Sequence, residues 1–217
     1  MSSDTLTLHY APQTRASTAR VLLDELGAPY ELDILNMHAG ELKSPAFLAI
    51  NPLGKVPTLT HGDTVVTESV AIALYLGDLF PQAGLTPMPG DPRRGAYLRW
   101  MTIYAACFEP AVIDKAAGHV PSAVQSPYGT YEGVVDLLAG QLGKAAYLLG
   151  DEITVADIHW GAALHWTLMF NLVLDLPVFT DYTRRVTSRE SFQKVFADDA
   201  RLATEHEAAA GAAAAAS

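Results

Sequence analysis

The hydrophobic pattern divides the chain into a first part that mixes strands with helices and a second part that is helical. Residues 5–10 and residues 30–35 read as short strands, the first with alternating apolar and polar side chains. Between them, apolar residues recur at helical spacing: Ala19, Leu22, Leu23 and Leu26. Gly27 follows at a position where glycine commonly ends a helix. The chain therefore begins strand–helix–strand, which predicts a parallel strand pair with a right-handed crossover.

Residues 51–69 predict a loop, two short strands and the start of a helix. A short helix is expected just before this stretch, around residues 45–49. The sequence His61-Gly62-Asp63 predicts a hairpin turn between strands at 58–61 and 64–66. Thr67 is expected to be the N-cap of a helix over residues 68–79.

A connector rich in proline and glycine, residues 80–92, precedes the helical part. The next helix carries one apolar stripe: Tyr97, Trp100, Met101, Tyr104, Ala105 and Phe108. Pro110 is expected to bend or break it. Further helices are predicted at about 129–149, 177–188 and 191–199. The alanine-rich tail from residue 208 is expected to be frayed helix or disordered.

The segment Gly150–Ile158 contains a capping box that predicts a buried helix start. Thr154 is placed as N-cap and Asp157 three residues later, so that each side chain reaches the other's backbone N–H. The nearby His159 and His165 are expected to lie on the same core helix. This interpretation favours a folding role for Asp157 and argues against a metal site.

Composition and charge exclude several function classes. The 217 residues carry 14 basic and 24 acidic side chains, a formal charge of −10, which argues against a general nucleic-acid or anionic-membrane binder. The single cysteine, Cys107, excludes an internal disulfide and favours a reducing cytoplasm. The first ten residues do not look like a signal peptide. Residues 160–176 are too short and polar for a membrane span.

Candidate binding chemistry gathers at Val56-Pro57 and Glu68-Ser69. Pro57 fits only the start or edge of a strand, and its peptide bond is a candidate for the cis isomer. The backbone of Val56 is then expected to face outward and pair with an extended peptide. Glu68 supplies a charge for an ammonium group, whereas Ser69 and the helix start favour an anion. Together they predict a pocket for a small zwitterionic peptide.

These two pairs, together with the Thr154–Asp157 box, resemble the glutathione transferase family over about residues 6–200. The resemblance implies an α/β thioredoxin-like N-terminal domain at 1–81 and an all-α helical-bundle C-terminal domain at 93–207. Composition indicates a linker at 82–92 and a low-complexity tail at 208–217. It also implies a cytoplasmic homodimer with a role in detoxification. Glutathione would be the co-substrate, with no metal, no nucleic acid and no membrane involved.

The resemblance further implies roles for individual residues. Lys55, Val56, Pro57, Glu68 and Ser69 would hold glutathione, with Lys43 or His38 as alternatives for its glycyl carboxylate. The loop after the first strand lacks a C-x-x-C pair, so the thiol must be brought in by the substrate. The catalytic candidates there are Thr14, Arg15 and Ser17, close to a helix start that favours a thiolate. The candidates for contacting the electrophile are Tyr10, Tyr104 and Phe108.

The sequence therefore predicts an enzyme that activates the glutathione thiol and conjugates it to a small hydrophobic electrophile. Two alternatives stay open. One is a glutathione-dependent peroxidase, reductase or dehalogenase, and the other is a transferase-like binding module without turnover. The physiological electrophile and the subclass do not follow from the sequence.

Overall fold

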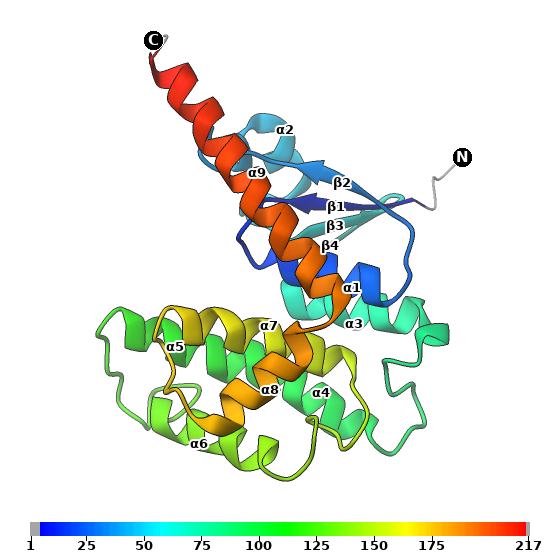
Figure 1. The fold of residues 1–217 in the computed structure, drawn as a ribbon, viewed down its shortest axis with the longest axis vertical. Helices are drawn as coiled ribbons and strands as arrows, with labels where there is room; N and C mark the ends of the chain where they lie inside the picture. Colours follow the sequence, from blue (N-terminus) through cyan, green and yellow to red (C-terminus); the bar gives the residue numbers. More distant parts are fainter. Residues whose placement is uncertain (1–4, 216–217) are drawn as a thin grey trace. The chain divides into compact units, whose positions relative to one another are not determined.

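The computed structural model describes residues 5–215, and of the last four of these only the backbone. The first four residues of the chain and the last two residues of the predicted tail lie outside this range. The described chain forms two compact units. One comprises the residues up to Phe80 together with those from Glu190 onward, and the other comprises Pro81–Arg189 (Figure 1).

The first unit is a four-stranded sheet with helices. Its elements are β1 (Leu6–Tyr10), α1 (Ala16–Glu25), β2 (Tyr30–Ile34), the short 3-10 helix η1 (Glu41–Lys43), α2 (Pro45–Ile50), β3 (Thr58–His61), β4 (Thr64–Thr67), α3 (Ser69–Leu79) and α9 (Glu190–Ala215). The strand order is β2-β1-β3-β4. The predicted parallel pairing of β1 with β2 is confirmed, and β3 runs antiparallel to both of its neighbours. Leu8, Leu23 and Leu59 are fully buried in its core.

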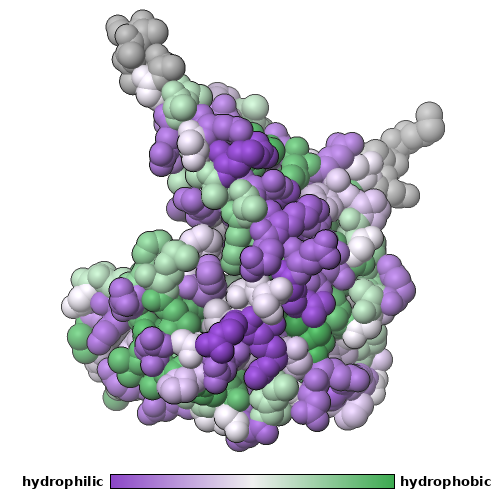
Figure 2. Space-filling view, in the orientation of Figure 1, coloured by the Kyte–Doolittle hydropathy of each residue, from purple (hydrophilic) through white to green (hydrophobic). Residues whose placement is uncertain are grey.

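The helix α9 belongs to the first unit, although the sequence placed residues up to 207 with the helical domain. It packs along α1 and is far longer than the predicted segment 191–199. Its inward residues Phe192, Val195 and Leu202 are buried, whereas hydrophilic side chains cover much of its visible face (Figure 2). An amphipathic helix of this kind is stabilised by burying its apolar stripe.

The second unit is helical. It contains the short 3-10 helix η2 (Pro81–Ala83), α4 (Arg94–Ile103), the π-helical turn η3 (Tyr104–Phe108), α5 (Glu109–Ala116), α6 (Tyr131–Leu142), α7 (Val155–Met169) and α8 (Pro177–Thr187). Instead of breaking the helix at Pro110, the chain inserts the π turn directly before it. Such a turn accommodates a residue that cannot donate its N–H. Gly161 lets α7 approach α8 closely, because a Cβ there would lie 2.5 Å from Val186 Cγ1.

The helix α6 ends at Leu142, seven residues before the predicted end at residue 149. The reason is a contact with a residue beyond the predicted helix. The backbone N–H of Leu148 donates to Asp157 Oδ1 at 2.8 Å, and Tyr147 pairs with Gly150 in an isolated bridge. These bonds hold the segment in a turn, which local helix propensity cannot predict.

The predicted capping box at Thr154 and Asp157 is confirmed. Asp157 Oδ2 accepts from the backbone N–H and the hydroxyl of Thr154, both at 2.8 Å. Its Oδ1 accepts from Leu148 and from the hydroxyl of Tyr182 at 2.9 Å. One fully buried carboxylate therefore joins the start of α7, the preceding loop and α8. Burial raises the pKa of Asp157, and the hydrogen bonds from Leu148 and Thr154 oppose the rise.

Among the described residues, no helix combines the length and the apolar composition needed to cross a membrane.

We expect Asp157→Ala to lower the free energy of unfolding by about 4 kcal/mol, because it leaves several buried donors without an acceptor. Denaturant unfolding followed by circular dichroism measures the change. Asp136→Ala, which removes an exposed carboxylate from α6 in the same unit, is the matched control and should change stability by less than about 0.5 kcal/mol. Equal stability of the two variants would contradict the role of Asp157.

Candidate functional site

The strand register brings three predicted segments to one end of the sheet. His9 in β1 pairs with Thr58 in β3, and Thr58 pairs with Thr67 in β4. The loop after β1, the Val56-Pro57 pair before β3 and the Glu68-Ser69 pair after β4 therefore emerge side by side. Adjacent strands lie about 4.8 Å apart, so the three segments span roughly 10 Å. That distance suits a small peptide.

The Val56-Pro57 peptide bond is cis, as the sequence predicted. Pro57 is buried and Val56 is half-buried. Asn51 fastens this turn, since its Nδ2 donates to the Lys55 carbonyl at 2.9 Å and contacts Thr58 Oγ1 at 3.0 Å. Within residues 5–215, no backbone hydrogen bond reaches Val56. This is compatible with the predicted pairing of Val56 with an extended ligand.

The helix α3 begins at Ser69, and its N-cap is Glu68 rather than the predicted Thr67. Thr67 is unavailable as a cap because it is the last residue of β4 and pairs with Thr58. Glu68 is exposed and adopts φ 69°, in the left-handed region that non-glycine residues seldom occupy. Among the described residues no side chain caps α3. The helix therefore presents its first N–H groups to an anion.

The three cationic candidates for a carboxylate differ in their surroundings. The ammonium group of Lys43 donates to the Leu53 carbonyl at 2.9 Å. Lys55 and His38 are exposed, and Lys55 directly precedes Val56. Of the three predicted candidates, Lys55 is therefore the best placed to bind the glycyl carboxylate of a peptide held at Val56.

Two of the catalytic candidates lie in the loop between β1 and α1. Thr14 is half-buried, and its Oγ1 donates to the Ala11 carbonyl at 2.7 Å and accepts from the Ala16 N–H at 3.1 Å. Arg15 is exposed and forms the N-cap of α1. Thr14 thus closes the loop and holds the start of the helix at the candidate site.

Two further predicted residues, Ser17 and Tyr10, lie in the core of the first unit. Ser17 is 1% exposed and Tyr10 is fully buried. The Ser17 hydroxyl donates to Asp199 Oδ2 at 2.5 Å, and the Tyr10 hydroxyl donates to Asp199 Oδ1. These contacts favour structural roles for both residues over the catalytic role expected of Ser17 and the substrate contact expected of Tyr10.

Asp199 is the residue that the sequence analysis missed. It is 2% exposed, on the apolar stripe of α9. Its spacing from Phe192, Val195 and Leu202 places a carboxylate on a face that is otherwise hydrophobic. A charge at such a position indicates a buried polar partner, and this signal was present in the sequence.

Tyr104 and Phe108, predicted to contact the electrophile, lie in the π turn and are buried. Their rings pack in an aromatic cluster, with Tyr104 at 4.3 Å from His159 and Phe108 at 4.9 Å from Trp160 between centroids. Contact with a second substrate stays a prediction for both residues.

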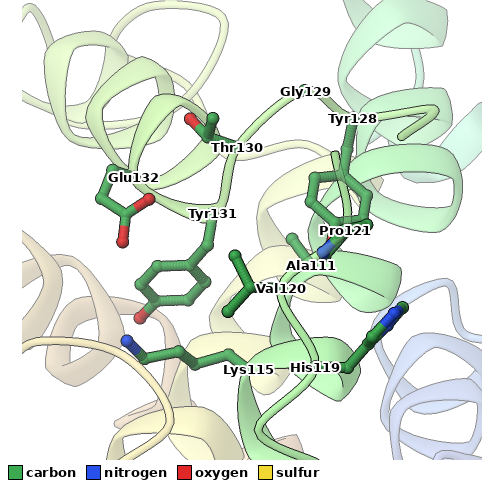
Figure 3. A pocket seen from close by; sticks show the side chains of 10 residues that line it. All are labelled: Ala111, Lys115, His119, Val120, Pro121, Tyr128, Gly129, Thr130, Tyr131 and Glu132. Carbon is green, nitrogen blue, oxygen red and sulfur yellow. The ribbon is translucent and has the colours of Figure 1, made fainter. Parts of the chain in front are cut away.

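The helical unit has a hollow of about 110 Å³ between the end of α5 and the start of α6 (Figure 3). Lys115 lies 5.1 Å from the centre of the Tyr131 ring on one side of it. On the other side, the Tyr128 hydroxyl donates to Asp114 at 2.6 Å, and His119 is near the same carboxylate. The residues predicted to form the site do not line this hollow.

In the part of the chain that the structure describes, no group of three or more histidine, cysteine, aspartate or glutamate side chains is arranged to hold a metal ion.

Comparisons with known proteins agree with the geometry. Residues 4–78 match the family model described as glutathione S-transferase, N-terminal domain, and residues 121–190 match the corresponding C-terminal domain. Glutathione S-transferase F13 of Arabidopsis thaliana is 31% identical over 203 residues, which cover 86% of this chain and 93% of the relative. Glutathione S-transferase F14 of the same plant is 27% identical over 212 residues, covering 89% and 84%.

Solved structures give the same result. A glutathione transferase from Methylococcus capsulatus superposes with a TM-score of 0.76 at 27% identity, covering 90% of this chain and 99% of the other. The transferase URE2P6 from Phanerochaete chrysosporium, solved with oxidised glutathione, has a TM-score of 0.76 at 25% identity, covering 92% and 98%. These likenesses confirm the predicted thioredoxin-like α/β part and the helical second part.

The buried carboxyl of Asp199 predicts a pH dependence of stability. Burial raises its pKa to about 7, and the hydrogen bond from the Gln13 N–H opposes the rise. An aspartate in an unfolded chain titrates at about pH 4. Between these pH values the folded protein keeps a proton that the unfolded chain has lost. The free energy of unfolding therefore falls as the pH rises through this window, and the loss is complete above the folded pKa.

We expect the stability of the unsubstituted protein to fall, relative to Asp199→Asn, by up to roughly 4 kcal/mol between about pH 4 and pH 7. Urea unfolding of both proteins across this range measures the difference. Parallel stability curves for the two proteins would show that Asp199 titrates as it does in the unfolded chain.

Proposed function

Because the chain belongs to the glutathione S-transferase family, we propose that it binds glutathione, stabilises the thiolate and transfers the sulfur to an apolar electrophile. The single observation that carries this proposal is the register of His9, Thr58 and Thr67. It supports one site in which peptide recognition and thiol activation are neighbours. The predicted homodimer, cytoplasmic location and detoxifying role belong to the same proposal.

Recognition of the peptide uses backbone groups first. The N–H and C=O of Val56 pair with the cysteinyl unit as a strand edge pairs with an added strand. The Glu68 carboxylate binds the ammonium of the γ-glutamyl end, and Ser69 with the first N–H groups of α3 binds its carboxylate. Lys55 binds the glycyl carboxylate. Structural relatives of this chain were solved with oxidised glutathione and with bound glutathione, which supports this choice of ligand.

Activation of the thiol uses the start of α1. The partial positive charge of a helix N-terminus favours a thiolate over a thiol, and hydroxyl donors add to the effect. Thr14 is the hydroxyl at this position, and it reaches the sulfur by turning its proton away from the Ala11 carbonyl. Arg15 adds a positive charge at the same helix end. Ser17 takes no direct part, because its hydroxyl is bound to Asp199.

The reaction balances as a nucleophilic substitution. The thiol proton passes to solvent, and a sulfur lone pair forms the new carbon–sulfur bond. The leaving group departs with the electron pair of the bond that breaks. Holding the thiolate next to the electrophile supplies rate through proximity.

We expect the purified protein to be retained on immobilised glutathione and to turn over a chloronitrobenzene electrophile. Retention on the column measures glutathione binding. The absorbance of the thioether product measures conjugation separately. Retention without turnover would contradict the transferase proposal and support a binding module. Loss of both would contradict glutathione binding itself.

We expect Glu68→Gln to raise the KM for glutathione by about tenfold and to change kcat by less than about threefold, because the lost charge binds the ammonium far from the sulfur. Steady-state kinetics with glutathione varied at saturating electrophile measure both constants. Glu31→Gln on β2 is the matched control, since it removes an exposed carboxylate from the strand at one edge of the same sheet. Unchanged KM in Glu68→Gln would remove Glu68 from the site.

A further inference from the structure

One carboxylate from α9 holds the loop between β1 and α1 at three points. Asp199 accepts from the Tyr10 hydroxyl, from the Ser17 hydroxyl at 2.5 Å and from the backbone N–H of Gln13. Tyr10 ends β1, Ser17 lies in the first turn of α1, and Gln13 is in the middle of the loop. Both ends and the centre of the loop are therefore fastened to the same buried group.

The conformation of the loop needs such support. Gln13 adopts φ 56°, a left-handed conformation that is unfavourable for a residue with a Cβ. A carboxylate offers acceptor sites on both oxygens, enough for three donors at once. Because Asp199 is 2% exposed, water does not compete for these sites. The bond to Gln13 N–H thus compensates for the unfavourable backbone directly before Thr14.

We propose that Asp199 is a positioning residue for thiol activation: by bonding Tyr10, Gln13 and Ser17 it fixes the loop that carries Thr14 and the start of α1. This inference rests on the proposed function. Asp199 does not touch the substrate. Its effect reaches the sulfur through the loop, whereas Val56, Glu68 and Ser69 bind the peptide from other segments.

The same helix offers a control for the packing of α9. Asp198, the preceding residue, pairs with Arg20 on α1 at 2.5 Å. Arg20 is 6% exposed, and its guanidinium lies 5.5 Å from the centre of the Tyr10 ring. This pair joins α9 to α1 without a bond to the loop. Asp198→Asn therefore disturbs the same helix contact and leaves the acceptor of Gln13 intact.

The first test is hydrogen exchange of the full chain without glutathione. At about pH 8, where the Asp199 carboxyl is ionised, we expect the Gln13 amide in Asp199→Asn to exchange about tenfold faster than in the unsubstituted protein, because it loses a charge-assisted acceptor. In Asp198→Asn its exchange should stay within about twofold of the unsubstituted protein. Equal exchange of Gln13 in Asp199→Asn and the unsubstituted protein overturns the proposal.

The second test separates chemistry from binding. In Asp199→Asn we expect kcat to fall about tenfold, the KM for glutathione to change by less than about threefold, and the pKa of the bound thiol, read from thiolate absorbance, to rise. A raised KM with unchanged kcat, or unchanged kinetics despite faster Gln13 exchange, overturns the role in thiol activation. An unsubstituted protein without turnover contradicts the proposed function instead, and the exchange rates still decide whether Asp199 holds the loop.

If Asp199→Asn does not fold, Tyr10→Phe takes its place, because it removes one donor and keeps the buried ring. We expect Gln13 to exchange faster and kcat to fall, as in Asp199→Asn. On a logarithmic scale each change should be about half of that expected for Asp199→Asn. Parent-like values for both quantities in Tyr10→Phe overturn the proposal as well.

Discussion

The backbone register across β1, β3 and β4 is the constraint on which the candidate site depends. The proposed recognition of a peptide at Val56 uses main-chain groups, whose positions follow from the ladder that begins at Thr58. A slip of one residue in β3 would move Val56 by about 3.3 Å and turn Leu59 out of the core. Leu59 is fully buried, so the hydrophobic effect that stabilises the sheet also fixes the register. The core of the unit and its site are therefore specified by the same interactions.

Local patterns were sufficient to predict most elements of the fold, including the two segments proposed to bind the peptide. The order of strands and helices, the cis bond before Pro57 and the capping box at Asp157 each follow from a few neighbouring residues. The errors arose where a contact with a residue outside the predicted element determines where that element begins or ends. The helix α6 ends early because Leu148 donates to Asp157. Thr67 is not a cap because it belongs to the ladder with Thr58.

The loop between β1 and α1 was the part of the candidate site that the sequence described least well, and burial explains why. A hydroxyl two or three residues into a helix reads as a candidate donor, whether it faces a substrate or the interior. The structure distinguishes Thr14, which is half-buried in the loop, from Ser17, whose hydroxyl reaches Asp199 some 182 residues later. No pattern within the loop contains that information. The only sequence signal was the carboxylate on the apolar stripe of α9.

Asp157 in the second unit and Asp199 in the first stabilise their surroundings by the same kind of interaction. Each is a buried carboxylate that accepts from donors on separate segments, and burial raises the pKa of each. Removing such a group leaves its donors unsatisfied in a site that water does not enter, so its loss is more severe than the loss of one hydrogen bond. At Asp157 the fastened segments are the start of α7, the loop before it and α8, and the result is stability. At Asp199 one of them is a loop with an unfavourable backbone conformation, beside the helix start that we propose favours a thiolate. The same interaction therefore becomes a means of holding reactive geometry, because of where its donors lie.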